Sequence, residues 1–271
     1  MQSIENTKRI ETIYGSFFSW DDDLITKQLE KFSAHTRNEL SMLRSFIREG
    51  DNILDIGAHI GTFSIPFSIF NKTKGKIYSF EANPNNYKLL MANIQANNLD
   101  GIILPTHAVV SLKENIEFSF LADGENNSGS YYFSPNSENL EDSVTSINID
   151  NWHSQLNKRI QIRLIKIDVE GAELSALRSC QKVIQEYKPI LYIELNKTAL
   201  QRFKTTCKDI EDILGPLGYH YFHNIGSRNS DHDIFEIASL KALEEGGNFF
   251  DVLAVHSSDA RYPKQYSVGT N

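Results

Sequence analysis

The sequence predicts an α/β protein with a Rossmann-like, mostly parallel sheet and helices on both faces. The first observation is an alternation in which helix-like stretches separate short apolar runs, at residues 53–56, 76–80, 102–110, 163–168 and 189–194. Parallel strands need such crossovers, which are right-handed. The second observation is a glycine turn directly after the first run, where doubly wound folds place their ligand-facing turn.

We expect residues 1–50 to form a helical preamble that packs onto the core and lids the ligand site. Residues 1–20 carry no clear pattern, whereas a helical pattern begins at Asp21. The clearest apolar stripe, at i, i+3, i+6 and i+7, consists of Leu40, Leu43, Phe46 and Ile47. Within this preamble, residues 35–39 are the part that we expect to touch the ligand.

The remaining elements follow in order through a main domain at residues 51–256. Apolar periodicity predicts helices at residues 62–70, 85–97, 172–185 and 209–217. The last two strands are predicted at 219–222 and 249–256, and the polar stretch between them, 224–247, is expected to be partly loop. The tail at 257–271 lacks an apolar period and is expected to fray.

Residues 113–150 interrupt the alternation and are predicted to be an insertion of antiparallel β-hairpins. Eight acidic residues against Lys113 alone give this segment a charge of −7, nearly the whole formal charge of −8. Its aromatic residues are Phe118, Phe120, Tyr131, Tyr132 and Phe133. They form either a wall that binds a sugar or simply the inner face of the hairpins, since strands favour aromatic residues.

Composition narrows the classes of function. The 271 residues are enough for a sizeable core, and the chain has no basic stripe of the kind that nucleic-acid binding requires. No apolar run approaches the roughly 18 residues of a membrane span. The first residues lack the apolar segment of a signal peptide, so we expect a cytoplasmic protein. The two cysteines, Cys180 and Cys207, indicate no disulfide framework or metal site, and Cys180 fits a buried helix position.

The glycine turn indicates a nucleoside ligand without a phosphate. The first strand leads through Asp55 to Gly57 and Gly61, and Glu81 ends the second strand 26 positions after Asp55. A dinucleotide fingerprint has a third glycine, and Asp55 would repel a pyrophosphate. An acid there suits an amine-bearing ligand such as S-adenosylmethionine, while Glu81 can accept hydrogen bonds from ribose hydroxyls. The alternative is an ordinary α/β turn with a surface glutamate.

Carboxylates at the strand ends are the candidate catalytic groups. Asp55, Glu81, Asp168 and Glu194 each end a predicted parallel strand, so they are expected to rim one crevice. We assign Asp168 and Glu194 to the reacting end, with Glu170 beside them. There a carboxylate can act as general base on a hydroxyl or hold a divalent cation. The alternative for Glu170 is a salt bridge with Lys166; no metal site is predicted.

Two histidines lie near the predicted crevice. His59 stands inside the glycine turn, so its backbone is expected near the cofactor, and its ring can contact the cofactor or act as a base. His107 lies near the end of the third strand, where we interpret it as a satisfied core histidine.

Four motifs together resemble the FkbM family of S-adenosylmethionine-dependent class I methyltransferases. They are DIGAHIG, FEANPNNYKLLMANIQAN, IKIDVEGAE and the later YIE, of which IKIDVEGAE is the most specific. The similarity spans residues 39–218. It implies a seven-stranded Rossmann-like sheet whose last strand is antiparallel, and methylation of hydroxyl groups on sugars, glycans or natural products.

The resemblance also implies roles for individual residues. Glu81 would hold the ribose, and Asp168 and Glu170 would lie beside the transferred methyl group. The methionine moiety would be held by Asp55, Gly57, Ala58 and Gly61. His59 departs from the family, which usually has Asn there, and Ala82 stands where Pro is common. We include His59, Ala82 and Ala108 among the expected cofactor-binding residues.

The function predicted from the sequence is methyl transfer from S-adenosylmethionine to a hydroxyl, on a sugar, glycan or natural product. An NAD-dependent oxidoreductase and a non-catalytic nucleoside-binding module remain alternatives. The expected partner is a small-molecule or glycan substrate rather than nucleic acid. The acceptor itself and the oligomeric state are not readable from the sequence.

Overall fold

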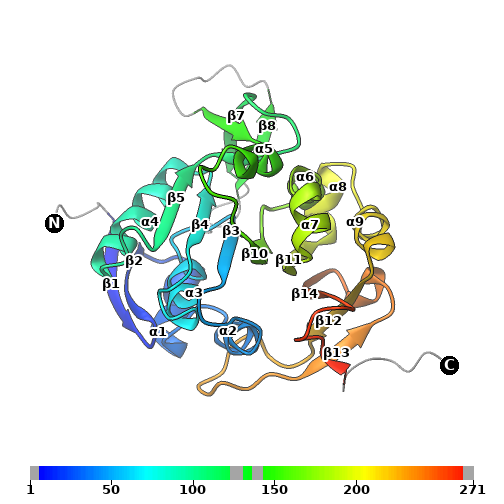
Figure 1. The fold of residues 1–271 in the computed structure, drawn as a ribbon. Coiled ribbons are helices and arrows are strands. Elements are labelled where there is room, and N and C mark those ends of the chain that lie inside the picture. The colour runs from blue at the N-terminus through cyan, green and yellow to red at the C-terminus, as the bar shows by residue number, and fades with distance from the viewer. Residues whose placement is uncertain (1–5, 123–130, 136–142, 265–271) are drawn as a thin grey trace.

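A sheet of eight strands forms the centre of the computed structural model, which describes residues 6–122, 131–135 and 143–264 (Figure 1). In spatial order its strands are β13 (Ile237–Leu240), β12 (Tyr219–Asn224), β14 (Phe249–His256), β11 (Ile190–Asn196), β10 (Ile162–Ile167), β3 (Asn52–Ile56), β4 (Ile77–Glu81) and β5 (Ile103–His107). Strands β11, β10, β3, β4 and β5 are parallel, and β14 is antiparallel to both of its neighbours. The order along the chain reverses between β3 and β10, where doubly wound sheets bind ligands.

The predicted mostly parallel Rossmann-like sheet is therefore confirmed, with one strand more than the expected seven. The additional strand is β13, which pairs with β12 at the sheet edge. It lies in the stretch 224–247, which was expected to be polar and partly loop. Only Ile237 and Leu240 of β13 are buried, so this short edge strand shows little apolar pattern.

Helices cover both faces of the sheet, and each face has its own apolar cluster. The first face carries α1 (Leu24–Phe32), α2 (Arg37–Arg44), α3 (Ser64–Phe70) and α4 (Pro84–Ala96). The second carries α5 (Ile149–Ser154), α6 (Glu173–Ser179), α7 (Gln181–Tyr187), α8 (Lys197–Arg202) and α9 (Cys207–Leu214). The short 3₁₀ helices η1 (Gly215–Leu217) and η2 (Leu243–Gly246) complete the described elements.

Two predicted helices differ in detail from the structure. The helix predicted over 172–185 is two helices, α6 and α7, because the backbone at Cys180 leaves the helical region with φ −103° and ψ 8°. Cys180 is fully buried, as its helical setting predicted. The helix predicted over 85–97 is α4, which begins at Pro84 after an Asn83 cap that accepts hydrogen bonds from the next turn.

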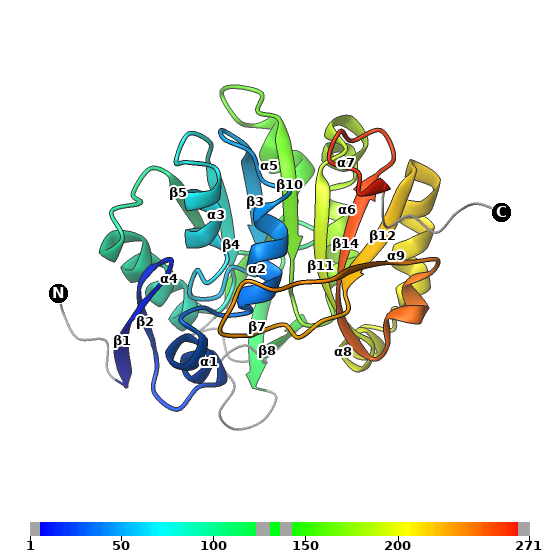
Figure 2. The same ribbon diagram turned by 90° about the horizontal axis from the view of Figure 1, so that it is seen from below.

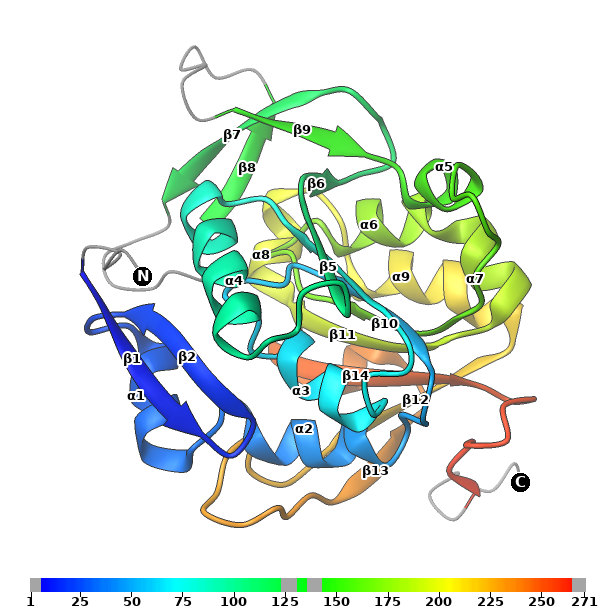
Figure 3. The ribbon, with the colours of Figure 1, turned by 60° about the vertical axis from the view of Figure 1, so that its left-hand side comes forward.

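The expectation of a helical preamble is correct only from Leu24 onward. Residues 7–20 instead form an antiparallel hairpin of β1 (Thr7–Thr12) and β2 (Gly15–Trp20), which lies beside α4 (Figure 3). The outer edge of β2 is covered by two side-chain amides, one from α4 and one from the residue that caps its C-terminus. Asn97 pairs with the backbone of Ser16, and Asn93 pairs with that of Phe18. The hairpin thus depends on partners about 80 residues away, which a local pattern cannot reveal.

The insertion forms a second sheet, as predicted, from β6 (Val109–Val110), β7 (Glu117–Ala122), β8 (Tyr131–Pro135) and β9 (Val144–Ile147). β7 pairs antiparallel with β8 and β9, whereas β6 pairs parallel with β9. The run predicted as one strand over 102–110 therefore divides between two sheets. Phe118 packs against Ala82, Val109 and Val144 as an inner-face residue. The other aromatic side chains of the expected sugar wall lie outside the described residues.

The first part of the tail is anchored to the core rather than frayed. The Arg261 side chain is almost fully buried, and it donates a hydrogen bond of 2.7 Å to the Phe46 carbonyl and pairs with Asp51 and Asp259. Across the described ranges, no helix has the length and apolar character needed to cross a membrane.

Candidate active site

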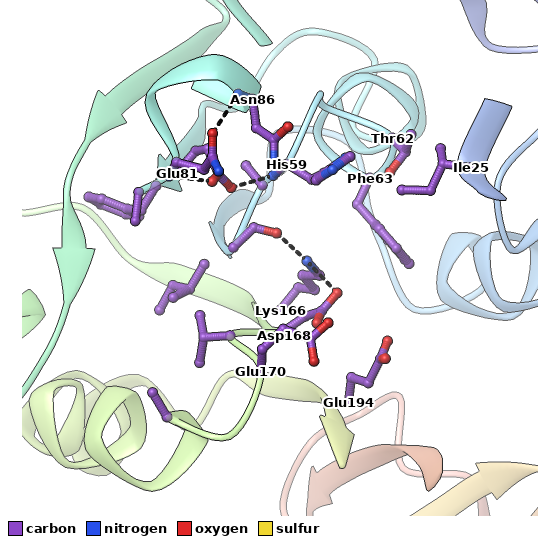
Figure 4. A pocket seen from close by; sticks show the side chains of 18 of the residues that line it. Ile25, His59, Thr62, Phe63, Glu81, Asn86, Lys166, Asp168, Glu170 and Glu194 are labelled. Carbon is purple, nitrogen blue, oxygen red and sulfur yellow. Dashed lines mark hydrogen bonds and ion pairs between the residues drawn. The ribbon is translucent and has the colours of Figure 1, made fainter. Parts of the chain in front are cut away.

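A cavity of about 330 Å³ lies at the carboxyl ends of β3, β4, β10 and β11 (Figure 4). Nine residues predicted from the sequence line it: Gly57, Ala58, His59, Glu81, Ala82, Ala108, Asp168, Glu170 and Glu194. Residues of the preamble line it too, namely Leu24, Ile25, Gln28 and His35. Two predicted residues, Asp55 and Gly61, do not line it.

The glycine turn lines the cavity through Gly57, Ala58 and His59. Gly57 has φ +79°, and a Cβ there would lie 1.8 Å from the Asp168 carbonyl oxygen, so only glycine lets the two strand ends approach this closely. The amides of Gly57 and Ala58 both donate to Phe80 O. Gly61 serves the turn instead, since its Cβ would meet Leu90 of α4 at 3.0 Å.

Glu81 is held beside the glycine turn, and backbone amides fix both of its carboxylate oxygens. Its Oε2 accepts 2.7 Å from the His59 amide, and its Oε1 accepts 2.7 Å from the Asn83 amide. Burial raises the Glu81 pKa to about 7, while the two backbone donors oppose the rise. Each oxygen keeps a free lone pair, so the carboxylate can accept two hydroxyl hydrogen bonds, as a ribose diol offers.

The assignment of Asp55 to direct cofactor contact is not supported by the geometry. Its carboxylate is fully buried, accepts a 2.5 Å hydrogen bond from Ser64 Oγ and lies 3.5 Å from Lys166 Nζ. Lys166 in turn donates to Gly57 O at 2.6 Å and pairs with Asp168 at 3.2 Å. Burial alone would lower the Lys166 pKa, but Asp168 and Asp55 raise it above its ordinary value. Asp55 thus supports the lysine that joins the two turns.

Asp168, Glu170 and Glu194 meet at the far end of the cavity, as predicted (Figure 4). Lys166, which the sequence offered as a salt-bridge partner of Glu170, pairs with Asp55 and Asp168. Burial raises the Glu194 pKa well above its ordinary value, and Asp168 and Asp251 raise it further.

Sequence reasoning missed several residues at this end. Arg228, from the connection between β12 and β13, lies 3.1 Å from Glu194 and pairs also with Asp251. Phe249 and Asn196 line the same wall from neighbouring strands, where they are register partners. Arg228 lies in a polar stretch without a motif. The acids Glu194 and Asp251 indicate that a cation is needed between them. That signal becomes visible only once β11 and β14 are known to pair.

The histidines differ in position. His35 lines the cavity, as expected for residues 35–39, and burial, then the charge of Arg228, lowers its pKa well below the ordinary value. His107, interpreted as a core histidine, is instead exposed at the end of edge strand β5, where Nε2 meets Ala82 O at 2.9 Å and the ring stacks on Tyr87. His59 contributes its amide to Glu81.

Glu39 supports the wall from behind without lining it. Tyr192 Oη and Asn224 Nδ2 donate to its carboxylate, at 3.2 and 2.7 Å, and burial together with Asp251 raises its pKa to about 7. In the part of the chain that the structure describes, no group of three or more His, Cys, Asp or Glu side chains is placed to hold a metal ion.

One family model matches the chain over residues 55–221, more than half of its length, and its description is methyltransferase FkbM domain. No curated protein matches the chain. The matched segment contains the glycine turn, Glu81, Asp168 and Glu194, whereas Arg228 and Phe249 lie beyond it.

Solved structures align with the chain at low identity. Methyltransferase FkbM from Methylobacillus flagellatus KT is 17% identical with a TM-score of 0.46, over 77% of this chain and 44% of that one, so this chain spans less than half of that protein. A SAM-dependent O-methyltransferase from Thermotoga maritima is 12% identical with a TM-score of 0.46, over 92% and 77%. Fibrillarin from Aeropyrum pernix, with natively bound S-adenosyl-L-methionine, is 10% identical with a TM-score of 0.44, over 94% and 84%.

Proposed function

We propose, from the premise that this chain belongs to the methyltransferase FkbM domain family, that it methylates a hydroxyl group with S-adenosylmethionine as donor. The observation that supports the proposal is that acidic side chains stand at both ends of one cavity. Glu81 is fixed at one end by two backbone amides, and Asp168 and Glu194 stand at the other.

The residues present fit this cofactor. Glu81 offers two acceptors for a ribose diol, and Gly57, whose Cβ would collide with Asp168 O, lets the two strand ends meet beside it. Ala82, Ala108, Val109 and Val110 add an apolar wall beside Glu81 for a flat base. Asp168 supplies a negative charge to a ligand that carries an amine and a sulfonium. We assign the methionine moiety to the turn of Gly57, Ala58 and His59.

Bound S-adenosylmethionine supplies an electrophilic methyl group, and the protein must place a hydroxyl in line with it and remove the hydroxyl proton. We assign proton removal to Glu194. Burial and the neighbouring acids raise its pKa, which makes the ionised carboxylate a stronger base than an exposed glutamate. Asp168 and Glu170 orient the hydroxyl, and Lys166 fixes Asp168. The amide of His59 keeps Glu81 in place, so the ring of His59 has no assigned step.

We propose a sugar or a related neutral ring compound as the acceptor. The exposed ring of Phe249 lines the cavity and can stack on the apolar face of a sugar ring. Asn196 and the carboxylates can bond its hydroxyls. Those carboxylates disfavour an acceptor with a phosphate beside the reacting group. The main domain, residues 51–256, would carry the reaction, and residues 1–50 would cover the cavity through α1 and His35.

Calorimetric titration with S-adenosylhomocysteine tests cofactor binding. We expect wild type to bind, and Glu81→Ala to bind about 100-fold more weakly, because it loses charge-assisted hydrogen bonds. Glu49→Ala, at an exposed acid outside the cavity, is the control and should bind as wild type does. Equal affinity of Glu81→Ala and wild type would contradict the proposal.

Transfer of a labelled methyl group to a panel of sugars, nucleotide-sugars and glycans tests the reaction. We expect Glu194→Gln to keep the affinity for S-adenosylhomocysteine and to lose turnover by about 100-fold or more. Turnover should survive EDTA, since the carboxylate itself takes the proton. Retained turnover in Glu194→Gln would remove the base assignment, and loss of turnover with EDTA would replace it with a metal mechanism.

A further inference from the structure

The cation at the reacting end comes from outside the parallel strands. Arg228 lies in residues 225–236, the connection between β12 and β13. Its Nη2 is 3.1 Å from Glu194 Oε2, and its Nε is 3.0 Å from Asp251 Oδ2. Its guanidinium carbon lies 5.1 Å from the centroid of the Phe249 ring. One side chain therefore contacts two acids and an aromatic ring at the reacting end.

Strand pairing creates the need for this cation. Glu194 on β11 and Asp251 on β14 are register partners, so two carboxylates stand side by side on one face of the sheet. Like charges placed opposite one another on neighbouring strands are destabilising, more so when they are buried. Lys166 is already paired with Asp55 and Asp168. Among the described residues, Arg228 is the cation in direct contact with Glu194.

The connection that carries Arg228 is docked on the N-terminal helices. The Asn38 amide donates to Arg228 O at 3.0 Å, and Asn38 Nδ2 donates to Ser227 O at 2.7 Å. On the other side of Arg228, Asn229 Oδ1 accepts from the Arg37 amide at 2.8 Å. Figure 2 shows this connection passing beside α2 and α1. The start of α2 thus sets where the guanidinium lies.

We propose that Arg228 is a positioning residue, which favours the ionised form of the Glu194 carboxylate and directs it into the cavity to receive the acceptor proton. This inference rests on the proposed function, because it takes Glu194 as the base. It explains how a carboxylate buried beside other acids is kept available for proton transfer. It also links the docking of the preamble to the reacting end, since the same connection bonds both.

Every element around Glu194 contributes charge to its titration. The groups are Lys166 and Asp168 from β10 and its end, Glu170 from the next turn, Asp251 from β14, Tyr192 from β11 and Arg228 itself. Of these, Arg228 lowers the Glu194 pKa, whereas Asp168, Asp251 and Glu170 raise it. Removing Arg228 and removing Asp251 must therefore move the titration of Glu194 in opposite directions.

The test is an NMR titration of the full chain labelled with ¹³C at the glutamate δ-carbon. It needs neither cofactor nor acceptor, so its outcome is independent of the methyl-transfer assay. The Glu194 signal is identified by its loss in Glu194→Gln. We expect its midpoint to rise by about 1 to 2 pH units in Arg228→Gln, and to return most of the way in Arg228→Lys. We expect it to fall in Asp251→Asn.

Arg159→Gln, which breaks a surface pair with Glu186, is the matched control and should leave the midpoint in place. Asn38→Ala should raise the midpoint by less than Arg228→Gln, because it loosens the connection without removing the charge. A midpoint unchanged in Arg228→Gln would overturn the proposal. If Arg228→Gln does not fold, Asn38→Ala decides, and a midpoint unchanged in that variant would overturn the proposal.

Discussion

The two ends of the cavity are built in different ways. At the Glu81 end, the contacts join residues close in sequence, and backbone amides of His59 and Asn83 fix the carboxylate. At the Glu194 end, side chains fix side chains. Arg228 lies 34 residues from Glu194, and Glu39 is bonded to Tyr192 and Asn224, 153 and 185 residues away. The first end is local and the second is assembled by the whole fold.

This difference indicates which end of the cavity can change its chemistry between proteins that share the fold. Backbone amides at a strand end persist through most side-chain changes, which suits an invariant cofactor. A cluster of charged side chains changes with each substitution, which suits an acceptor site that must differ between proteins. Lys166 joins the two ends, because it bonds Gly57 O on one side and Asp168 on the other.

The largest effect on stability that we expect comes from removing Lys166, which joins the two ends. Lys166→Met leaves the buried Asp55 carboxylate without its cation and should lower the free energy of unfolding by about 3 to 5 kcal/mol, measured by urea denaturation. The double variant Asp55→Asn/Lys166→Met should recover much of the loss, because no buried charge remains. A loss below about 1 kcal/mol for Lys166→Met would show that the two ends do not depend on this ion pair.

A smaller effect on the free energy of unfolding distinguishes two properties of Gly57 at the cofactor end. These are its close approach to Asp168 O and its left-handed backbone conformation. Gly57→Ala should lower the free energy of unfolding by about 3 kcal/mol, because a left-handed φ is combined with a collision against Asp168 O. Gly101→Ala is the matched control. Gly101 has φ +74° but no atom near its Cβ position, so we expect a loss of about 1 kcal/mol. Equal losses in Gly57→Ala and Gly101→Ala would mean that the collision with Asp168 O adds nothing to the loss of stability in Gly57→Ala.

Glu173, in the turn region after β10, is expected to make the free energy of unfolding depend on pH. Glu173 accepts from the Gly171 amide at 2.9 Å, and its Oε2 is buried without a partner. Burial raises its pKa from 4.5 to about 7 in the folded protein. The folded state therefore binds the proton more tightly than the unfolded chain. This stabilisation is complete below pH 4.5 and is lost as pH rises through about 7.

Glu173→Gln keeps the acceptor oxygen and removes the ionisation. Relative to wild type, it should gain about 2 kcal/mol in the free energy of unfolding at about pH 8 and nothing at about pH 4.5. Denaturant unfolding at both pH values measures this. A variant with the same difference from wild type at both values would show that Glu173 does not titrate in this range.

The smallest effect concerns the acceptor wall. Phe249→Ala should raise the KM for the acceptor about tenfold, which corresponds to about 1.4 kcal/mol of stacking, and leave S-adenosylhomocysteine binding unchanged. Leu112 has a similar exposure, 48% against 49%, and lies outside the cavity, so Leu112→Ala is the control. A weaker cofactor affinity in Phe249→Ala would place this ring at the Glu81 end instead.

The sequence predicted the Glu81 end well because strand, turn, helix and acid follow one another within about 30 residues. The error at Asp55 has a physical cause. A pattern shows that an acid stands near a strand end, but not that Ser64 and Lys166 will enclose it. At the Glu194 end, the acids were predicted and their cation was not, since Arg228 reaches them only through the connection between β12 and β13, which is docked on α2.

The pairing of β2 with Asn93 and Asn97 has a consequence for the order of events during synthesis. The two side-chain amides act as a substitute strand along an edge that otherwise exposes its backbone. A two-stranded ribbon is marginal alone in water. The hairpin leaves the ribosome before α4, so its edge stays uncovered until residue 97 has followed. The hairpin is thus secured only by a segment that is made later, and this delay opens an interval for pairing with another chain.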